Sequence, residues 1–301
     1  MQAKKNPKIA YIGKFSLLHD EEYIARSFEK LGCEVIRIPQ SSQWFDIKNT
    51  LEVHRPDILI YGKWECPKDI FSTILRLKRE GMKTVCWLFD LYFGYTREYQ
   101  VRNKSFFRSD YVFTTDGGHG AQFSQYGIKH ICVRQGIYDD ECILLPLKPM
   151  KYDVVFVGSD NPIFPERKER LRHIASYCNF QWFGKKDTNE KRGMDLNELY
   201  AESKIVVGDS FYSPHYWSNR IVETLGRGGF LIHQEVEGLK NEYPDLVTYK
   251  RGDLQDLRKK IEYYLSHEVE RQEIIKKNYN LVKSRYTMDK KCNDILQWLN
   301  Q

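Results

Sequence analysis

Short apolar runs alternate with longer amphipathic stretches along the first 136 residues of the chain. The runs with strand character are KIAYIGKF, CEVIRIP, DILIYGKW, KTVCWLFD, YVFTTD and HICVRQG. Helices are predicted between them, near residues 21–31, 46–54, 68–80, 97–107 and 119–126. Strands that are apolar on both faces and alternate with helices are typical of a parallel sheet with right-handed crossovers. The pattern therefore predicts a doubly wound α/β domain.

The same alternation starts again after residues 137–152, which contain two prolines and no periodicity. The second set of predicted strands is DVVFVGSDN, FQWFGKKD, KIVVGDS, GFLIHQ and LVTYKRGD. Predicted helices cover 165–177, 195–202, a segment after Ser213, 236–243 and 253–266. We therefore expect two Rossmann-like parallel-sheet domains whose strand ends face each other across a central cleft, where such sheets bind ligands.

The boundaries follow from this repetition. We assign residues 1–145 to the first domain and 151–285 to the second. Residues 286–301 carry a late apolar stripe at Ile295, Trp298 and Leu299, which needs a partner surface. We expect this last helix to return to the first domain and pack there.

Composition limits the class of protein. No apolar run is long enough to span a bilayer, and the start of the sequence lacks a signal-peptide core, so we expect a cytoplasmic protein. The seven cysteines are scattered and form no CxxC pair, which favours reduced thiols over disulfides or zinc ligands. The net charge of +6 suits anionic ligands and neither requires nor excludes a nucleic acid partner. Nothing in the sequence indicates an oligomeric state.

The stretch from Gly208 to His233 carries the most specific pattern. It predicts a helix that begins at Ser213-Pro214 or at Ser218, between two strands. Residues three and four apart share a helical face, so the helix has two stripes. The apolar stripe consists of Trp217, Ile221, Val222 and Leu225, and the polar stripe of Tyr216, Asn219, Arg220, Glu223 and Arg227.

The polar stripe is suited to a nucleotide. The amino end of a helix and the cation of Arg220 favour a diphosphate, while the carboxylate of Glu223 can accept hydrogen bonds from paired sugar hydroxyls. The alternative is a surface ion pair between Arg220 and Glu223. By their place at strand ends, Gly158, Ser159 and Lys185 are further candidates for the diphosphate, and Asp209 and His215 are candidates to face a sugar.

The remaining charged groups leave several alternatives. His19 is a candidate general base or part of an N-terminal cap, and Asp90 at the end of its strand is an alternative base. We expect Asp20 and Glu21 to act on the helix dipole. The basic run Arg167, Lys168 and Arg170 is expected to form a solvated helix face. No DxD, GxxxxGK[ST], HExxH or GxSxG motif occurs, so we expect arginines, lysines and helix ends, with no metal, to neutralise a bound diphosphate.

The second half resembles group 1 glycosyltransferases of the GT-B fold, and within them the branch related to the spore maturation protein CgeB. The resemblance rests on R-[IV]-x-E-x-L-x-x-G-G-F-L-I from Arg220 to Ile232, followed by Glu237 to Leu239. It implies that Glu223 holds the ribose of a nucleotide sugar and that basic residues hold its diphosphate. Group 1 enzymes commonly carry a second, sugar-facing glutamate eight positions earlier, where this chain has His215.

These observations predict a metal-independent glycosyltransferase without a resident cofactor. Its co-substrate is expected to be a nucleotide sugar, UDP-linked by preference, and its acceptor a glycan, a protein, a small molecule or a modified nucleic acid base. Two alternatives stay open at this point, a GT-B epimerase or phosphorylase and a non-catalytic module that binds sugar nucleotides.

Overall fold

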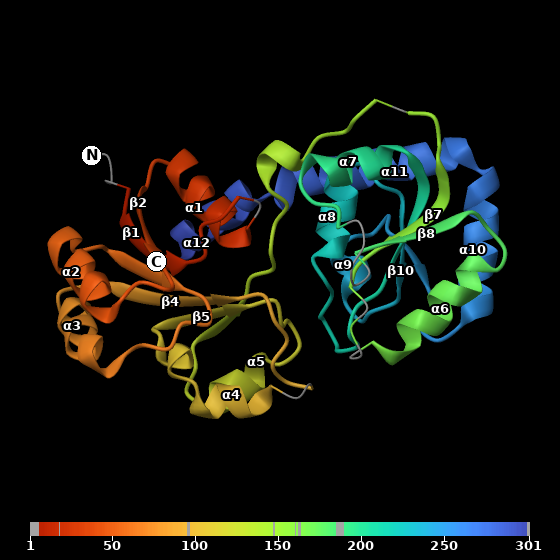
Figure 1. The fold of residues 1–301 in the computed structure, drawn as a ribbon. Coiled ribbons are helices and arrows are strands. Elements are labelled where there is room, and N and C mark those ends of the chain that lie inside the picture. Colours follow the sequence, from red (N-terminus) through yellow and green to blue (C-terminus); the bar gives the residue numbers. More distant parts are fainter. Residues whose placement is uncertain are drawn as a thin grey trace. The chain divides into compact units, whose positions relative to one another are not determined.

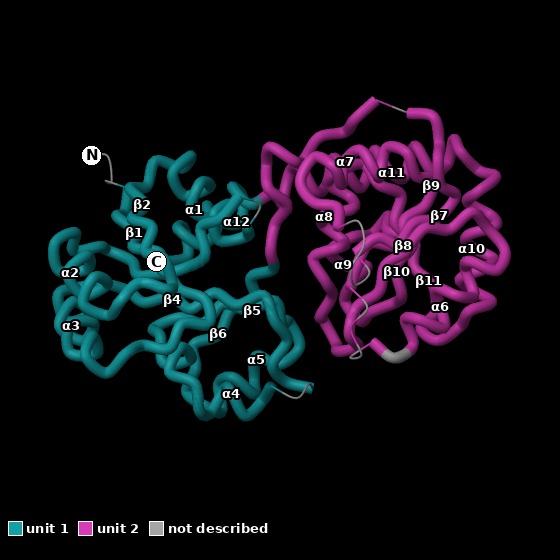
Figure 2. The backbone as a smooth tube through the Cα atoms, in the orientation of Figure 1, with its two compact units in different colours: residues 1–134, 288–301 teal, residues 135–287 magenta. Residues whose placement is uncertain are grey.

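The computed structural model describes residues 6–17, 19–94, 97–146, 148–159, 161, 164–184 and 190–299. The chain divides into two compact units, each built around one parallel sheet (Figure 2). Unit 1 comprises residues 1–134 and 288–301, and unit 2 comprises residues 135–287. The predicted fold class, two Rossmann-like parallel-sheet domains, is confirmed.

Unit 1 contains a six-stranded sheet in the order β2-β1-β3-β4-β5-β6, with every neighbouring pair parallel. Its strands are β1 (Lys8–Gly13), β2 (Glu34–Pro39), β3 (Ile58–Tyr61), β4 (Lys83–Leu88), β5 (Tyr111–Thr114) and β6 (His130–Cys132). Its helices are α1 (Asp20–Lys30), α2 (Trp44–His54), α3 (Lys68–Arg79), α4 (Glu98–Asn103), the 3₁₀ turn η1 (Ser105–Arg108), α5 (Gly120–Gln125) and α12 (Met288–Leu299).

The sheet of unit 1 separates two cores, because its central strands are apolar on both faces. One core packs under α2, α3 and α5. The other packs under α1 and α12, the first and last helices of the chain (Figure 1). Ile295 and Leu299 of α12 are buried there, and the indole of Trp298 meets the ring of Tyr111 edge to face, 4.7 Å between centroids. The predicted return of the C-terminal helix to the first domain is therefore confirmed.

Unit 2 contains a five-stranded parallel sheet in the order β11-β10-β9-β7-β8. Its strands are β7 (Tyr152–Val157), β8 (Phe180–Phe183), β9 (Ser203–Gly208), β10 (Leu231–Gln234) and β11 (Val247–Tyr249). Its helices are the 3₁₀ turn η2 (Asp139–Glu141), α6 (Pro165–Ala175), α7 (Met194–Ala201), α8 (Arg220–Gly226), α9 (Leu239–Glu242), α10 (Leu254–Ser266) and α11 (Glu268–Arg285).

Residues 135–146 pack in unit 2, although the hydrophobic pattern assigns most of them to the first domain. The side chain of Ile137 is fully buried in the unit 2 core, against the glycine at position 226 of α8. Apart from the short turn η2 and one bridge between Ile137 and Thr287, the segment is irregular, so its anchoring depends on contacts that periodicity does not reveal. Among the helices described, none combines the length and the apolar character needed to cross a membrane.

Candidate active site

Two pockets lie at the carboxyl edges of the two sheets, one within each unit. The arginine pocket of unit 2 has a volume of about 320 Å³, and the histidine pocket of unit 1 about 210 Å³. The arginine pocket is lined by Phe164, Glu166, Arg167, Arg170, Asp209, Ser210, Phe211, Tyr212, Gln234 and Arg251. The histidine pocket is lined by Lys14, His19, Asp20, Glu21, Gln40, Gly62, Lys63, Trp87, Leu88, Phe89 and Asp90.

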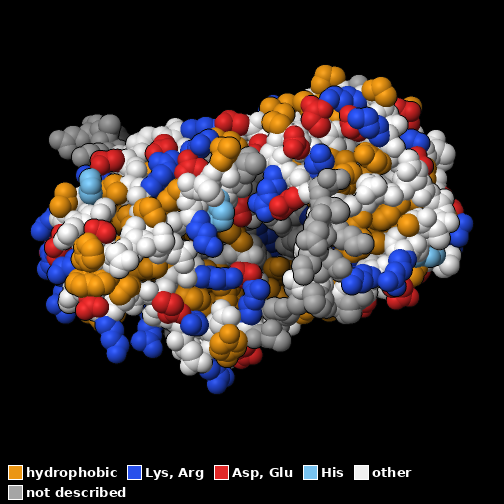
Figure 3. Space-filling view, in the orientation of Figure 1, with side chains coloured by type: hydrophobic (Ala, Val, Ile, Leu, Met, Phe, Trp, Pro, Cys, Tyr) orange, Lys and Arg blue, Asp and Glu red, His pale blue; other side chains and the backbone are white. Residues whose placement is uncertain are grey.

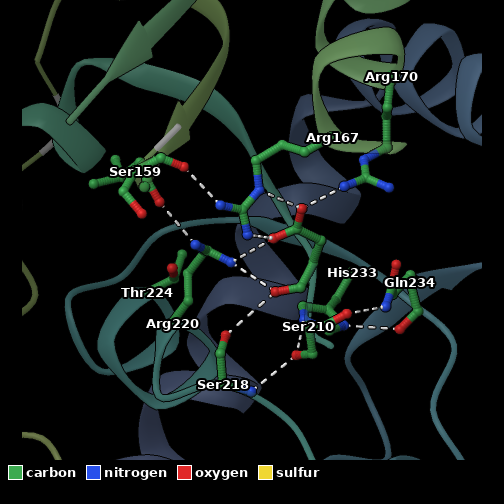
Figure 4. A network of polar contacts seen from close by, with 12 residues as sticks. Ser159, Arg167, Arg170, Ser210, Ser218, Arg220, Thr224, His233 and Gln234 are labelled. Atoms are coloured by element: carbon green, nitrogen blue, oxygen red, sulfur yellow. Dashed lines mark hydrogen bonds and ion pairs between the residues drawn. The ribbon is translucent and has the colours of Figure 1, made fainter. Parts of the chain in front are cut away.

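Asp209, which follows β9, is buried at the centre of an ion cluster. Figure 4 labels the three arginines that contact it, Arg167, Arg170 and Arg220. Arg167 donates two hydrogen bonds to the Asp209 carboxylate, at 2.8 and 2.7 Å, and Arg170 and Arg220 contact the same group. Burial alone would raise the pKa of Asp209, but the charges of Arg220 and Arg167 outweigh it and hold that pKa well below its usual range. With an exposed fraction of 2%, this carboxylate positions arginines, and the prediction that it faces a sugar is not supported.

The basic run of α6 is not the solvated face that we predicted for it. Arg167 and Arg170 are 3% and 6% exposed and point toward Asp209, whereas Lys168 between them is exposed. Positions three apart on a helix share a face, so the two arginines turn inward together. The prediction was wrong because the pattern shows a charged stripe but not the buried carboxylate that the stripe meets.

Arg220 lies at the start of α8, with its side chain 13% exposed, and joins three elements. Its Nε donates to the carbonyl of Val157 at 2.8 Å, its Nη1 to the carbonyl of Asp209 at 2.7 Å, and its guanidinium lies 4.7 Å from the ring centre of Phe156. A Cβ at position 158 would lie 2.6 Å from Nη2, which explains the glycine there. Arg220 therefore does not pair with Glu223, and its neighbours make it a residue that orders the strand ends.

The loop before α8 is longer than predicted, and the proposed helix start at Ser213-Pro214 is wrong. The helix begins at Arg220, one residue after Asn219, and the hydroxyl of Ser210 accepts a hydrogen bond from the backbone N–H of Ser218. His215 has a positive φ of 53° and its N–H donates to the carbonyl of Glu237. The apolar stripe is confirmed for Ile221, Val222 and Leu225, which are buried on α8, whereas Trp217 is buried in the loop before the helix.

Other residues predicted to bind the donor also lie in unit 2. Glu223 contacts Arg227, which in turn contacts Glu141, so an ion-paired chain runs along α8. The amide of Asn219 donates to the side chain of Gln135 at 3.3 Å. Tyr216 is half-buried in the loop before α8, and the carbonyl of Ser159 accepts a hydrogen bond from Arg167. Lys185 falls outside the described residues.

His233 supports the floor of the arginine pocket from β10. It is fully buried, with Nε2 3.1 Å from the hydroxyl of Ser210 and Nδ1 2.8 Å from the carbonyl of Gln234. Burial lowers the pKa of His233 to about 4, so the imidazole is neutral at physiological pH. The amide of Gln234 donates to the carbonyl of Ser210 and fixes the same loop.

The histidine pocket brings together both predicted base candidates, His19 and Asp90. The carboxylate of Asp90 contacts two cations, Lys63 at 2.5 Å and Arg97. His19 precedes α1, and its Nδ1 lies 3.2 Å from Oε2 of Glu21. His19 follows β1 and Asp90 follows β4, two strands of the same sheet that β3 separates.

Arg251 and Tyr212 were missed as pocket residues by sequence reasoning. The guanidinium of Arg251, which follows β11, lies 4.3 Å from the ring centre of Tyr212, and Nη2 is 3.9 Å from Glu166. The available signal was their place after predicted strands, at the same edge as Asp209. The sequence does not show which residues these two contact, so nothing distinguished them from the other arginines and tyrosines of the chain.

A sequence model of a glycosyl transferase-like family matches residues 147–297, half of the chain and nearly all of unit 2. The chain belongs to this family. The matched glycosyltransferase segment contains every residue of the arginine pocket. No curated protein matches the sequence.

Solved structures resemble this glycosyltransferase along nearly its whole length. They include the sucrose-phosphate synthase of Thermosynechococcus elongatus, with 11% identity, a TM-score of 0.64 and 98% of each chain covered. Anabaena HepE, solved with UDP-glucose, has 11% identity and a TM-score of 0.63 over 98% of this chain and 99% of its own. A UDP-forming trehalose-phosphate synthase from Burkholderia xenovorans has 11% identity and a TM-score of 0.65, with 98% and 99% covered. At such identity the likeness shows the fold alone, which is GT-B.

Proposed function

We propose that this glycosyltransferase moves a sugar from a nucleotide-sugar donor, whose diphosphate binds in the arginine pocket. One observation carries the proposal: three arginines share a single carboxylate, two of them buried and the third, Arg220, with its side chain 13% exposed. In the described part of the chain, Asp209 is the one carboxylate that contacts Arg167, Arg170 and Arg220, which leaves an excess positive charge away from water. Burying unpaired charge is costly, so the cluster favours an anion with more than one negative charge.

The excess positive charge belongs to the arginine cluster around Asp209. On the face of the molecule in Figure 3, basic and acidic side chains are interspersed over both units. Inside the arginine pocket, Nε of Arg170 is buried and has no hydrogen-bond partner, and Arg251 adds a half-exposed guanidinium. Guanidinium groups bind phosphate oxygens in a bidentate manner, so these two groups are the proposed diphosphate ligands.

The rest of the donor is assigned from the sequence predictions. Gly158, Ser159 and Lys185 are proposed to border the diphosphate, Tyr216 and Asn219 the nucleoside, and Glu223 the ribose hydroxyls, with His215 toward the sugar. Anabaena HepE with UDP-glucose and the UDP-forming synthase support a UDP-linked donor by analogy of fold. The motif from Arg220 to Ile232 supports placing the chain in the CgeB-related branch of group 1.

The chemistry we propose needs no resident cofactor or metal. As the bond from the sugar C1 to the diphosphate breaks, charge develops on the leaving group, and prearranged guanidinium groups stabilise it. His19 is the proposed base for the acceptor hydroxyl. Asp90 is the weaker candidate, because Lys63 and Arg97 already neutralise its carboxylate.

Binding of a panel of nucleotide sugars and nucleoside diphosphates, measured by thermal shift and calorimetry, tests the proposal. A bound donor at 100 times its Kd should stabilise the fold by about 2.7 kcal/mol. Arg170→Gln should weaken UDP binding at least 10-fold, since a hydrogen bond to a charged group contributes roughly 1.5–3 kcal/mol. Lys168→Gln, two residues away on the exposed face of α6, is the matched control and should bind as the wild type does.

The outcomes separate the alternatives. If no nucleoside diphosphate binds, or if Arg170→Gln binds as tightly as the wild type, the proposal fails. Conversion of a nucleotide sugar without any acceptor into an isomer would instead show an epimerase. A donor that binds but is neither hydrolysed nor transferred would show a binding module.

A further inference from the structure

Another pocket lies within unit 2, at the amino edge of its sheet. Ser203 and Lys204, the first residues of β9, line this amino-edge pocket. The arginine pocket is lined by Asp209 and Ser210, which follow the other end of the same strand. The amino-edge pocket has a volume of about 110 Å³. It is therefore separate from the site proposed for the donor.

One wall of the amino-edge pocket comes from the segment that precedes β7. The fully buried amide of Asn197 on α7 donates hydrogen bonds to the carbonyls of Glu141 and Ile143, at 2.9 and 3.2 Å (Figure 1). Leu144 then covers the turn after α8, where a Cβ on Gly228 would lie 2.3 Å from the Cδ1 of the leucine. The segment is thus anchored on two helices before it reaches the pocket.

The lining of the amino-edge pocket combines apolar side chains with cations. The apolar side chains come from the segment before β7 and from α11, and they are Leu144, Leu145, Pro146, Met150 and Ile275. The cations are Lys204, Arg227 and Arg271. None of the described residues that line this pocket is acidic. Such a lining is suited to a ligand that is apolar at one end and negatively charged at the other.

Two of the three cations have acidic partners outside the lining. The Nζ of Lys204 lies 2.7 Å from the Oδ1 of Asp153. Arg227 contacts both Glu141 and Glu223, although its Nε is buried without a hydrogen-bond partner. The charges of Lys204 and Arg227 are therefore compensated within the fold.

Arg271 is the cation with the least compensation. It is 4% exposed, and no carboxylate among the described residues lies within ion-pair distance of it. Its Nη1 donates to the carbonyls of Tyr264 and Leu265 at the end of α10, and a helix end carries only about half a negative charge. Burial lowers the pKa of Arg271, against the opposing charge of Glu268. The hydrogen bonds found for Arg271 within the described residues use Nη1 alone, so Nε and Nη2 are available to an occupant.

We propose that the amino-edge pocket binds a small organic anion, in which one carboxylate is attached to a short apolar group. This inference goes beyond the proposed function and does not depend on it. The carboxylate accepts hydrogen bonds from Arg271, because the N–H groups of a guanidinium match the two oxygens of a carboxylate. The apolar group contacts Leu145, Met150 and Ile275. The volume admits only a few non-hydrogen atoms, since a cavity of about 150 Å³ holds one benzene molecule.

The number of uncompensated cations favours a single negative charge. A fully ionised phosphate would bring more charge than Arg271 alone can balance in a desolvated site. A bare inorganic ion would also leave the apolar walls without a partner. A short-chain carboxylate uses both parts of the lining.

Isobutyrate is the probe for this pocket, and its analogues separate charge from shape. Titrations of the ¹⁵N-labelled full chain, followed by NMR, measure each Kd. Isobutyramide has the same shape without the charge and should bind about 10-fold more weakly or worse, because it loses a charged hydrogen bond. Acetate keeps the charge but lacks the apolar group and should bind about 10-fold more weakly. Equal affinity for isobutyrate and either analogue, or tighter binding of inorganic phosphate, would overturn the inference.

Arg271→Gln tests the cation directly. It should weaken isobutyrate binding about 10-fold or more and leave isobutyramide binding nearly unchanged, since only the carboxylate uses the positive charge. Lys276→Gln is the matched control, because Lys276 is exposed on the same helix and does not line the pocket. Equal affinities of the two variants for isobutyrate would exclude Arg271 as the ligand of the carboxylate.

Ala201→Leu provides a second test if the loss of Arg271 weakens the end of α10. Ala201 ends α7 and lines the pocket, so a larger side chain there reduces the volume while Arg271 stays in place. Isobutyrate and isobutyramide should then both bind about 10-fold more weakly, because each loses contact with the apolar walls. An unchanged Kd for isobutyrate would show that the ligand binds elsewhere.

The arginine pocket is the competing site for a carboxylate. Arg170→Gln alters that pocket and should bind isobutyrate as the wild type does. A loss of isobutyrate affinity in this variant would place the carboxylate in the arginine pocket and overturn the inference. UDP should bind equally well to Arg271→Gln and to the wild type, so a failure to bind UDP would affect the proposed function alone.

Discussion

Asp90 and Asp209 occupy corresponding places in the two units, within two residues of the end of a strand at the carboxyl edge of a parallel sheet. Each contacts more than one cation. The side chain of Asp90 is 28% exposed and contacts Lys63 and Arg97, whereas that of Asp209 is 2% exposed and contacts three arginines. The same residue type at the same edge therefore serves two purposes. In unit 1 the carboxylate is one of several groups lining an open pocket, and in unit 2 it holds a buried positive cluster in place.

The difference shows that the degree of burial, more than the number of contacts, determines how an ion pair affects stability and binding. Water screens the exposed pair, so its contribution to stability is small. In the interior the same charges are poorly solvated, and each must be balanced by its neighbours. Asp209 balances one of three arginines, and the unbalanced remainder is what makes the arginine pocket a site for anions.

Asp209→Asn should have the largest effect on stability. It leaves three guanidinium groups, two of them buried, without a counter-charge, and removing one member of a buried ion pair costs about 3–5 kcal/mol. The free energy of unfolding, from urea titration, measures the loss, and excess pyrophosphate should restore part of it. A loss below about 1 kcal/mol would show that the cluster is solvated, and the comparison with Asp90 would fail.

Acidification should weaken both units through histidines whose pKa is lowered by full or partial burial. Burial lowers the pKa of His233 in unit 2 and of His130 in unit 1 to about 4 each, whereas an unfolded histidine titrates near 6.5. The unfolded state therefore binds the extra proton first, so stability is fully present above pH 6.5 and falls between 6.5 and 4. For fully buried His233 the loss approaches about 3 kcal/mol. Urea unfolding from pH 7 to 4.5 measures it.

Variants localise the acid effect to each unit. His233→Gln should reduce the pH dependence of the free energy of unfolding of unit 2. His130→Gln should do the same for unit 1. Asp209 contributes in a lower window, because its folded pKa lies below its unfolded value: its contribution is present above the unfolded pKa near 4 and is lost as the pH falls further. An unchanged slope between pH 6.5 and 4 in both histidine variants would contradict the assignment.

Arg251→Gln should weaken anion binding with little effect on folding. Its side chain is 40% exposed, so the expected change is about a 10-fold rise in the Kd for UDP or pyrophosphate, near the lower end for a charged hydrogen bond. Isothermal titration calorimetry measures it. Arg258→Gln on α10 is the control, since Arg258 is similarly exposed, pairs with Glu262 and does not line the pocket. Equal affinities in the two variants would exclude Arg251 from the site.

Asp90→Asn should have the smallest effect on stability, below about 1 kcal/mol, because its partners remain solvated after the change. The same variant also tests whether His19 or Asp90 is the catalytic base. If His19 is the base, Asp90→Asn should keep most of the turnover that His19→Ala loses. A loss of kcat as large as that of His19→Ala would assign the base to Asp90 instead.

Local pattern predicted the fold and the places of several candidate residues. His19 and Asp90, both chosen for their places after strands, line one pocket, and helical spacing identified Ile221, Val222 and Leu225 as a buried face of α8. The helix start was predicted too early, because Ser213-Pro214 has the local form of a cap while the chain there follows the loop that His215 and Gly238 shape. A capping motif shows that a helix can begin at a residue, but tertiary contacts determine whether it begins there.

The sequence by itself determined the two parallel sheets, the return of the last helix to unit 1 and the glycosyltransferase motif of α8. These depend on periodicity and on residue types a few positions apart, which a chain carries before it folds. Only the tertiary structure decided that Arg167 and Arg170 turn inward onto Asp209, about forty residues away, and that Arg271 lines a pocket together with the segment before β7. The physical reason is that desolvation and charge pairing depend on distance in space, and no spacing along the chain encodes how deeply a charged group is buried.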